Sequence, residues 1–265
     1  MSILPFLKWA GGKRWLVRAH EEIFNVNFNR YIEPFVGSGS VFFLLTPDNA
    51  ILSDKNKNLI DVYRAIKKDW ERVFERLLEH GSKHSYDHYY MVRSLVYEDE
   101  FSRAAQFIYL NRTCWNGLYR VNKQGQFNVP KGTKDKVILE TDDFERIADC
   151  LKNTILKDSD FEEIIEIASE GDLLFIDPPY IVNHNKNGFL KYNEKIFSWA
   201  DQLRLSNCVK EAKKRGVKII MTNASHDSIK ELYNEHFKII KVKRHSTIAA
   251  NSANRKICEE FLIAG

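Results

Sequence analysis

The stretch LLFIDPPY, residues 173–180, decides the fold that the sequence predicts. Four apolar residues are followed at once by an acid, two prolines and a tyrosine. A short apolar run bounded by turn residues is typical of a buried strand, so Asp177 is expected where that strand leaves the sheet. Open α/β sheets bind ligands at the carboxyl ends of their strands, which makes this turn a candidate site.

Two prolines make the turn stiff, because each ring fixes φ and restricts the residue before it. A stiff turn holds the Asp177 carboxylate, the Pro178 carbonyl and the Tyr180 ring in a fixed relation. This arrangement suits a planar base, whose exocyclic amino group can donate both hydrogens while its ring stacks on Tyr180. The tetrapeptide would also suit a surface turn with a solvated acid, so the rest of the chain must decide.

The remaining sequence alternates between strand and helix patterns. The clearest helix runs from Ser198 to Arg215, with Ser198 as its cap and Gly216 as its stop. Alternation predicts an α/β fold with a mostly parallel, doubly wound sheet. No helix separates the last two strands, so the sheet is expected to end with an antiparallel last strand. The predicted strands are residues 30–35, 50–54, 154–158, 173–177, 217–222, 237–244 and 256–264.

The composition is that of an ordinary globular protein, with 44% hydrophobic residues among 265. No apolar run is long enough to span a membrane and no signal peptide stands at the N-terminus, so we expect a cytoplasmic protein. The four cysteines lie far apart without a CxxC pair. That spacing argues against a zinc site and a disulfide framework, and no metal is expected.

Positive charge is concentrated in two segments, although the net charge is only +4. Residues 112–136 hold six basic residues and one acid, and residues 238–256 hold six basic residues and no acid. Charge runs are usually solvated surface, so these segments are weak support for a polyanion partner.

A glycine loop follows the first predicted strand, in YIEPFVGSGSVFF. Gly37 and Gly39 stand between that strand and an apolar helical run, as in nucleotide-binding loops. The dinucleotide and P-loop motifs both fail, because Phe42 and Leu7 stand where each needs a glycine. A ligand without a pyrophosphate, such as S-adenosylmethionine, suits the loop. Asp54 ends the next strand, where an acid can accept both ribose hydroxyls.

These motifs together resemble those of the Dam-type DNA adenine-N6 methyltransferases. The matching segments are FLKWAGGK, EPFVGSGSVFF, SDKN, YLNRTCWNGLYRVNKQGQFNVPKG, DPPY and RHSTIAANSANRK, which occur in the family's order and spacing along nearly the whole chain. The resemblance implies a class I methyltransferase sheet, with residues 1–58 and 141–265 as the S-adenosylmethionine-binding catalytic domain. It implies that residues 59–140 are an inserted, mainly helical domain that recognises the DNA target.

The resemblance also assigns roles to single residues. The expected catalytic residues, which grip the target adenine, are Asp177, Pro178 and Tyr180. The expected cofactor contacts are Trp9, Ala10, Gly11, Lys13, Glu33, Phe35, Gly37, Ser38, Gly39, Asp54, Asp160, Phe161 and Asp177. Asp158 competes with Asp160 for the place beside the cofactor's adenine. The expected DNA contacts are Lys8, Arg112, Trp115, Asn116, Leu118, Arg120, Asn122, Asn128 and Pro130.

Within the DNA set, Arg120 matches the family's guanine-reading arginine, and Leu118 and Pro130 match apolar contacts to the recognition site. Trp115 matches an aromatic residue that enters the base stack. Without the family context, Trp115 would be read as a core aromatic residue and Arg120 as a solvated loop charge. The polar segment 244–256 is expected near the phosphates around the flipped base.

The expected reaction transfers the methyl group of S-adenosylmethionine to N6 of a flipped adenine in duplex DNA. GATC is the expected recognition site, with the longer GATATC as an alternative, and the protein is expected to be a monomer with no membrane partner. Two rival functions remain. One is a methyltransferase for cytosine N4, RNA adenine or a protein amide, and the other is a catalytically silent DNA-binding module.

Overall fold

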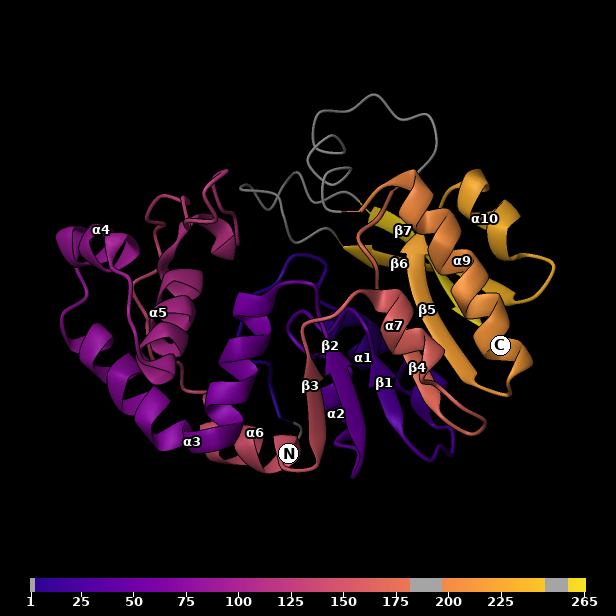
Figure 1. Cartoon of the computed structure of the whole chain (residues 1–265). Coiled ribbons are helices and arrows are strands. Elements are labelled where there is room, and N and C mark those ends of the chain that lie inside the picture. Colours follow the sequence, from indigo (N-terminus) through magenta and orange to yellow (C-terminus); the bar gives the residue numbers. More distant parts are fainter. Residues whose placement is uncertain (1–2, 182–196, 246–256) are drawn as a thin grey trace. The chain divides into compact units, whose positions relative to one another are not determined.

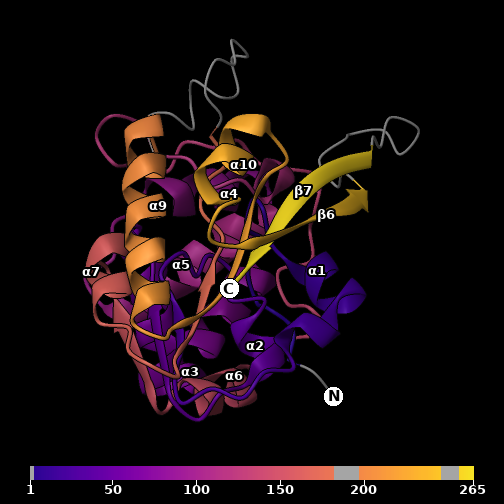
Figure 2. The same ribbon diagram turned by 90° about the vertical axis from the view of Figure 1, so that its right-hand side faces the viewer.

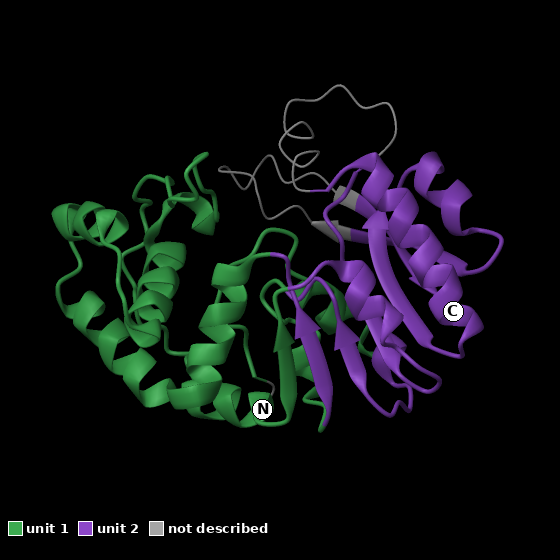
Figure 3. Cartoon of the chain, in the orientation of Figure 1, with its two compact units in different colours: residues 1–21, 37–48, 56–158 green, residues 22–36, 49–55, 159–265 purple. Residues whose placement is uncertain are grey.

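The computed structural model describes residues 3–181, 197–245 and 257–265. Two views show the helices and strands in their order along the chain (Figure 1, Figure 2). The chain divides into two compact units, coloured separately in Figure 3. Unit 1 comprises Met1–Glu21, Gly37–Asp48 and Asn56–Asp158, and unit 2 comprises Glu22–Val36, Asn49–Lys55 and Ser159–Gly265.

Unit 2 is built on a mostly parallel sheet. Its strands are β1 (Tyr31–Glu33), β2 (Ala50–Ser53), β4 (Leu173–Ile176), β5 (Lys218–Ala224), β6 (Lys238–His245) and β7 (Ile257–Ala264). They lie in the order β2-β1-β4-β5-β7-β6. The first four in this order are parallel, whereas β7 is antiparallel to both β5 and β6. The predicted sheet with an antiparallel last strand is therefore confirmed.

One face of this sheet carries the main apolar core of unit 2. Helices α7 (Phe161–Glu166), α9 (Trp199–Lys214) and α10 (Asp227–Tyr233) supply buried side chains to the same cluster as Leu174, Ile219 and Ile263 of the strands. On β4 the alternate residue Phe175 instead contacts Phe24 of the 3₁₀ helix η1 (Glu21–Phe24), with ring centroids 5.8 Å apart. The apolar run of β4 thus has partners on both faces, as expected for a central parallel strand.

Unit 1 is mainly helical. Its elements are α1 (Arg14–Ala19), α2 (Phe42–Leu45), α3 (Lys57–Ser82), α4 (Tyr86–Ser94), α5 (Glu100–Thr113), the 3₁₀ turn η2 (Trp115–Gly117), α6 (Phe144–Leu151) and β3 (Thr154–Lys157). Helix α3 packs against α5, α6 and β3. The ring of Phe6, in the N-terminal segment of unit 1, contacts the rings of Phe43, Tyr63 and Phe144.

Helix α3 is broken at Asp69, whose φ of −162° and ψ of 86° are not helical. The Asp69 carboxylate accepts a hydrogen bond from the backbone N–H of Arg72 at 3.1 Å. An acid that accepts from the third residue beyond it is the usual N-terminal cap, so Asp69 starts the second half of the helix.

Every strand predicted from the sequence is present within the described ranges, with ends that differ by a few residues. The helix predicted from Ser198 is α9, and its first turn contains a capping box. Ser198 accepts from the Asp201 backbone N–H at 3.2 Å, and Asp201 accepts from the Ser198 backbone N–H at 2.8 Å. Among the helices of the described ranges, none combines the length and the apolar character that crossing a membrane requires.

Replacing Ser198 with alanine should destabilise the protein. The substitution removes one half of the capping box, so it should cost about 1 kcal/mol of unfolding free energy and lower the melting temperature by roughly 2–4 °C. Ser94→Ala is the matched control, because the Ser94 hydroxyl donates to the Met91 carbonyl at the end of α4 and caps no N-terminus. Calorimetry gives the melting temperatures of both variants and of the wild-type protein. A Ser198→Ala variant that melts at the same temperature as the Ser94→Ala control would contradict the capping role.

Candidate functional site

Three acids gather where three neighbouring strands end. Glu33 is the last residue of β1, while Asp54 and Asp177 come directly after β2 and β4. Because β1 lies between β2 and β4 and all three are parallel, these acids share one edge of the sheet. Acidic groups are therefore concentrated where a sheet of this kind binds its ligands.

Glu33 shows the effect of this crowding. Its side chain is buried, and burial is the main cause that raises its pKa well above the usual value. The Tyr31 hydroxyl donates to Glu33 Oε2 at 2.8 Å and opposes the shift, whereas the charges of Asp177 and Asp54 add to it. A cationic ligand at this edge would compensate the remaining negative charge.

Asp177 is oriented by a residue of the adjacent strand. The hydroxyl of Thr222, which is buried on β5, donates to Asp177 Oδ1 at 2.7 Å. Pro178, the next residue, is buried, while Asp177 itself is half-buried. The carboxylate is thus fixed by a backbone turn and by a hydroxyl partner while part of its surface stays accessible.

Tyr180 is anchored at its polar end. Its hydroxyl donates to Oε2 of Glu260, a buried residue of β7, at 2.8 Å. Burial raises the pKa of Tyr180 well above its usual value, and the nearby charges of Asp177 and Glu260 raise it further. The side chain is therefore a neutral phenol, attached to the backbone at one end and hydrogen-bonded to Glu260 at the other.

An aromatic cluster stands beside the same strand ends. The rings of Phe35, after β1, and Phe161, at the start of α7, are stacked with centroids 5.5 Å apart. Phe197 contacts both, at 5.9 Å from Phe35 and 5.8 Å from Phe161. Flat apolar rings of this kind suit the planar base of a nucleoside.

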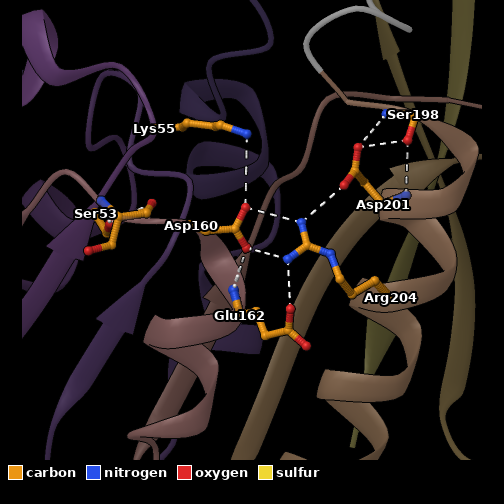
Figure 4. A network of polar contacts seen from close by, with 8 residues as sticks. Ser53, Lys55, Asp160, Glu162, Ser198, Asp201 and Arg204 are labelled. Atoms are coloured by element: carbon orange, nitrogen blue, oxygen red, sulfur yellow. Dashed lines mark hydrogen bonds and ion pairs between the residues drawn. The ribbon is translucent and has the colours of Figure 1, made fainter.

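Asp160 lies next to this cluster and takes part in the network of Figure 4. It accepts from the Glu162 backbone N–H at 3.1 Å, and Arg204 grips it with two nitrogens at 2.6 and 3.1 Å. The hydrogen bond from Arg204 is the main cause that lowers its pKa. The competing acid Asp158 instead pairs with Arg64 of unit 1 at 2.6 Å.

The glycine loop lies in unit 1, where Gly37 and Gly39 have φ values of +48° and +66°. A Cβ added at Gly37 would lie only 2.7 Å from the Trp9 ring. Glycine is therefore required there both by the positive φ and by this close approach. The Tyr63 hydroxyl donates to the Gly37 carbonyl at 3.1 Å. Ser38 is buried, and its hydroxyl lies 3.2 Å from that of Ser40.

The segment before α1 presents the other expected cofactor contacts of unit 1. The Trp9 ring is half-buried and stacks on Tyr119, with centroids 5.6 Å apart. Ala10 and Gly11 are exposed, whereas Lys13 is buried and donates to the Gly11 carbonyl at 2.7 Å. This hydrogen bond from the Lys13 ammonium group therefore stabilises the short turn that contains Gly11.

A buried asparagine joins two expected DNA contacts in unit 1. Asn111 accepts from the Lys8 backbone N–H at 2.9 Å and donates to the Lys8 carbonyl at 2.8 Å. It also donates to the Gly117 carbonyl at 3.3 Å, at the end of the turn that carries Trp115 and Asn116. Lys8, Trp115 and Asn116 are all exposed, so this clamp brings three of the predicted residues to one accessible surface.

The following loop places Arg120 beside Asn128. The Arg120 Nε donates to Asn128 Oδ1 at 2.7 Å, and its Nη2 donates to the Asn128 carbonyl at 3.2 Å. Asn122 closes the tip, where its backbone N–H donates to the Gln126 carbonyl at 2.8 Å. The guanidinium is thus oriented and solvent-exposed, as a base-reading arginine must be.

Leu118 and Pro130 complete the predicted DNA set in this loop. Leu118 is half-buried and Pro130 is exposed. The Pro130 carbonyl accepts from the Trp115 backbone N–H at 2.9 Å, which ties the far end of the loop to the turn.

Arg112 differs from the other predicted DNA contacts, because it is only 2% exposed. It donates to the Phe6 and Val137 carbonyls and to both oxygens of Asp142, the latter at 2.6 Å each. A contact between its guanidinium and DNA would have to break this buried network, at a large cost in free energy.

Several residues with clear structural roles were not predicted, namely Asn111, Phe197, Arg204, Thr222 and Glu260. Glu260 had a partial signal, since it lies inside a predicted strand directly before the apolar residues 261–263, but Glu259 beside it is equally acidic. The others carry no distinctive local pattern, because their partners lie far away in sequence. Among the described residues, no group of three or more His, Cys, Asp and Glu side chains is placed to hold a metal ion.

The chain is similar to known proteins along nearly its whole length. Residues 9–248 match the family described as D12 class N6 adenine-specific DNA methyltransferase. The type II methyltransferase M1.LlaDCHI of Lactococcus lactis is 36% identical over 99% of this chain and 95% of its own length. The type II methyltransferase M.MjaIII of Methanocaldococcus jannaschii is 36% identical over 97% of this chain and 96% of its own. A DNA adenine methylase of Haemophilus influenzae is 31% identical, over 97% and 92% respectively.

Replacing Glu33 with glutamine should stabilise the protein at neutral and higher pH. A carboxyl group whose folded-state pKa is raised contributes stability below its unfolded pKa and loses it as pH rises toward the folded value. Glutamine keeps the acceptor for Tyr31 but cannot ionise. The melting temperatures of the two proteins should therefore coincide near pH 4 and diverge as pH increases, with the variant higher. A constant difference across the pH range would contradict the raised pKa.

Proposed function

The chain belongs to the D12 class N6 adenine-specific DNA methyltransferases, and from this membership we propose that it methylates N6 of a flipped adenine within GATC in duplex DNA, with S-adenosylmethionine as donor. The enzyme class, an adenine-specific DNA methyltransferase, follows from the family itself. The donor, the recognition sequence, the flipped base and the role of each residue are proposals. We also propose that the enzyme works as a monomer in the cytoplasm.

The residues of the site fit S-adenosylmethionine. Its sulfonium is a cation, which suits the crowded acids at the ends of β1, β2 and β4. Its ribose carries two hydroxyls for Asp54, and its adenine suits Phe161 with Asp160 as an acceptor. The proposed contacts, which follow from the family resemblance, are Glu33, Phe35, Asp54, Asp160, Phe161, Asp177, Trp9, Ala10, Gly11, Lys13, Gly37, Ser38 and Gly39.

The fixed orientation of Asp177 is the observation that carries the proposed chemistry. Thr222 holds one carboxylate oxygen at 2.7 Å, and the proline turn sets the backbone carbonyl of Pro178. Two acceptors in fixed positions can bind both hydrogens of an adenine amino group. They favour a pyramidal nitrogen, whose lone pair is then directed away from the ring and available for attack.

When bound, S-adenosylmethionine supplies a methyl group activated by the sulfonium. The N6–C bond forms as the S–C bond breaks, and the sulfur keeps the bonding electron pair as a thioether. N6 then carries an extra proton, and Asp177 is the acceptor placed to receive it. The Tyr180 ring stacks on the flipped adenine and recovers part of the unstacking cost, which is roughly a few kcal/mol.

For DNA recognition we propose residues 59–140, with Lys8 added from the N-terminal segment. Arg120 reads guanine through its planar fork, while Asn128 holds that fork in place. Trp115 enters the base stack beside Asn116, and Leu118, Asn122 and Pro130 add further contacts. Arg112 supports this surface from inside through Asp142, because its guanidinium is buried.

The proposal is tested by transfer of isotopically labelled methyl from S-adenosylmethionine to duplexes containing one GATC or one GATATC. Label should appear as N6-methyldeoxyadenosine after nucleoside digestion, and it should be absent from a duplex methylated beforehand on both strands. Asp177→Ala should lower kcat by roughly 10²–10³-fold, since it removes an acceptor for developing charge. The exposed acid Asp227 offers a matched control, Asp227→Ala, which should retain wild-type rates.

Other outcomes would replace the proposal by one of its rivals. Label in N4-methyldeoxycytidine, in RNA or in protein would indicate another acceptor. Binding of DNA without binding of S-adenosylmethionine would indicate a silent DNA-binding module. Preference for GATATC over GATC would correct the recognition sequence alone.

Arg120→Ala should relax the sequence preference and leave cofactor binding intact. Loss of a two-point contact to guanine should reduce discrimination at that base pair by about 1–3 kcal/mol, or roughly 5- to 150-fold. The measurement is kcat/KM on duplexes that differ only at that base pair. Lys123→Ala, in the same exposed loop, should weaken binding to all duplexes equally. Reduced affinity for S-adenosylmethionine in Arg120→Ala would contradict the assignment.

A further inference from the structure

Glu260 is a charged side chain in a place where charge is costly. It lies on β7 and is 2% exposed, and the three residues that follow it, Phe261, Leu262 and Ile263, are buried apolar residues. A buried carboxylate is stable only when hydrogen bonds replace its lost water. No role in cofactor binding or DNA reading accounts for Glu260, so its position requires another explanation.

The backbone around Glu260 is paired with a neighbouring strand on each side. Strand β7 lies between β5 and β6, and Glu260 is paired with Ala224 on one side and Val242 on the other. Its Oε2 accepts the hydroxyl of Tyr180 at 2.8 Å. The hydroxyl oxygen lies on the axis of the second side-chain torsion, so this contact fixes the direction in which the Tyr180 side chain points. Because a phenol O–H prefers to lie in the plane of its ring, the position of the acceptor also favours one ring plane.

We propose that Glu260 is a positioning residue for methyl transfer, which orients Tyr180 against the flipped adenine and makes the face of its ring more negative. This inference rests on the proposed function. A hydrogen bond from a phenol to a carboxylate is charge-assisted and shifts electron density from the O–H bond toward the ring. The adenine becomes cationic as the methyl group arrives, and a more negative aromatic face stabilises that cation.

The proposal assigns complementary tasks to two neighbouring strands. Thr222 on β5 orients the acceptor Asp177 and also interacts with the Tyr180 hydroxyl, while Glu260 on β7 accepts the hydrogen bond of that hydroxyl. Register pairs Thr222 with Leu262 and Ala224 with Glu260, so both supporting side chains stand on one ladder. Strain in that ladder would disturb both groups of the catalytic turn together.

A double-mutant cycle separates this role from simple structural support. Glu260→Gln keeps the acceptor but removes its charge, and it should lower kcat about tenfold with an unchanged KM for S-adenosylmethionine. In a Tyr180→Phe background the same substitution should have no further effect on kcat, because the hydroxyl through which Glu260 acts is gone. The matched control is Glu259→Gln on the same strand, whose carboxylate is 41% exposed and faces Lys241 at 3.6 Å.

Two results would overturn the inference while leaving the proposed function intact. The first is an equal loss of kcat from Glu260→Gln in both backgrounds. The second is a lower melting temperature with unchanged kcat, which would show a structural role alone. A wild-type enzyme that transfers no methyl group to DNA would instead overturn the proposed function, together with the catalytic part of the inference.

The contact itself is measured without activity, by ¹³C NMR of protein labelled at the tyrosine Cζ. The Tyr180 resonance is identified by its loss in Tyr180→Phe. Because burial, Asp177 and Glu260 all raise the pKa of Tyr180, removing the Glu260 charge should bring that pKa down. Glu259→Gln should leave it in place. An unchanged Tyr180 titration in Glu260→Gln would show that the hydroxyl does not donate to Glu260 in solution.

Discussion

The convergence of acids at one edge of a parallel sheet is the constraint on which the rest of this structure depends. The carboxyl ends of neighbouring parallel strands lie at the same edge of the sheet, so Glu33, Asp54 and Asp177 lie close together. Like charges in a partly buried place are unfavourable unless a proton, a hydroxyl or a cation compensates them. Tyr31 and Thr222 supply hydroxyls, and the remaining imbalance favours a cationic ligand over an anionic one.

Much of the fold was predictable because its signals are local. An apolar run bounded by turn residues indicated β4, and coarse strand patterns indicated the other six strands of the described ranges. Ser198 indicated the start of α9 as a residue type that caps helices. The acids at strand ends followed from the same reasoning, since a residue after a parallel strand has only one edge to occupy. The glycine loop was a candidate from its position after the first predicted strand, whereas the DNA-reading segment became a candidate only through the resemblance to the family.

The partners of those residues were not predictable, because they depend on contacts between distant segments. Tyr180 and Glu260 are 80 positions apart, and Lys8 and Asn111 are 103 apart. Arg112 was predicted as a DNA contact for the same reason, because its distant partner could not be identified from the sequence. A basic residue within a basic segment looks like a DNA contact, and only the position of Asp142 reveals a buried ion pair. The charges in a sequence show which residues can form ion pairs, but not which of them are paired in the interior of the fold.

The position of β7 between β5 and β6 has a consequence for how the chain is made. During synthesis β5 and β6 emerge first, joined through α10, yet they are not neighbours in the finished sheet. A nascent chain that ends before Ile257 therefore leaves both inner edges open, with unpaired N–H and C=O groups that can bind other strands. These edges must be protected from other strands until β7 has been synthesised. Glu260, which accepts the hydrogen bond of Tyr180, is part of the same strand, so the Tyr180 contact forms only when β7 pairs with β5 and β6.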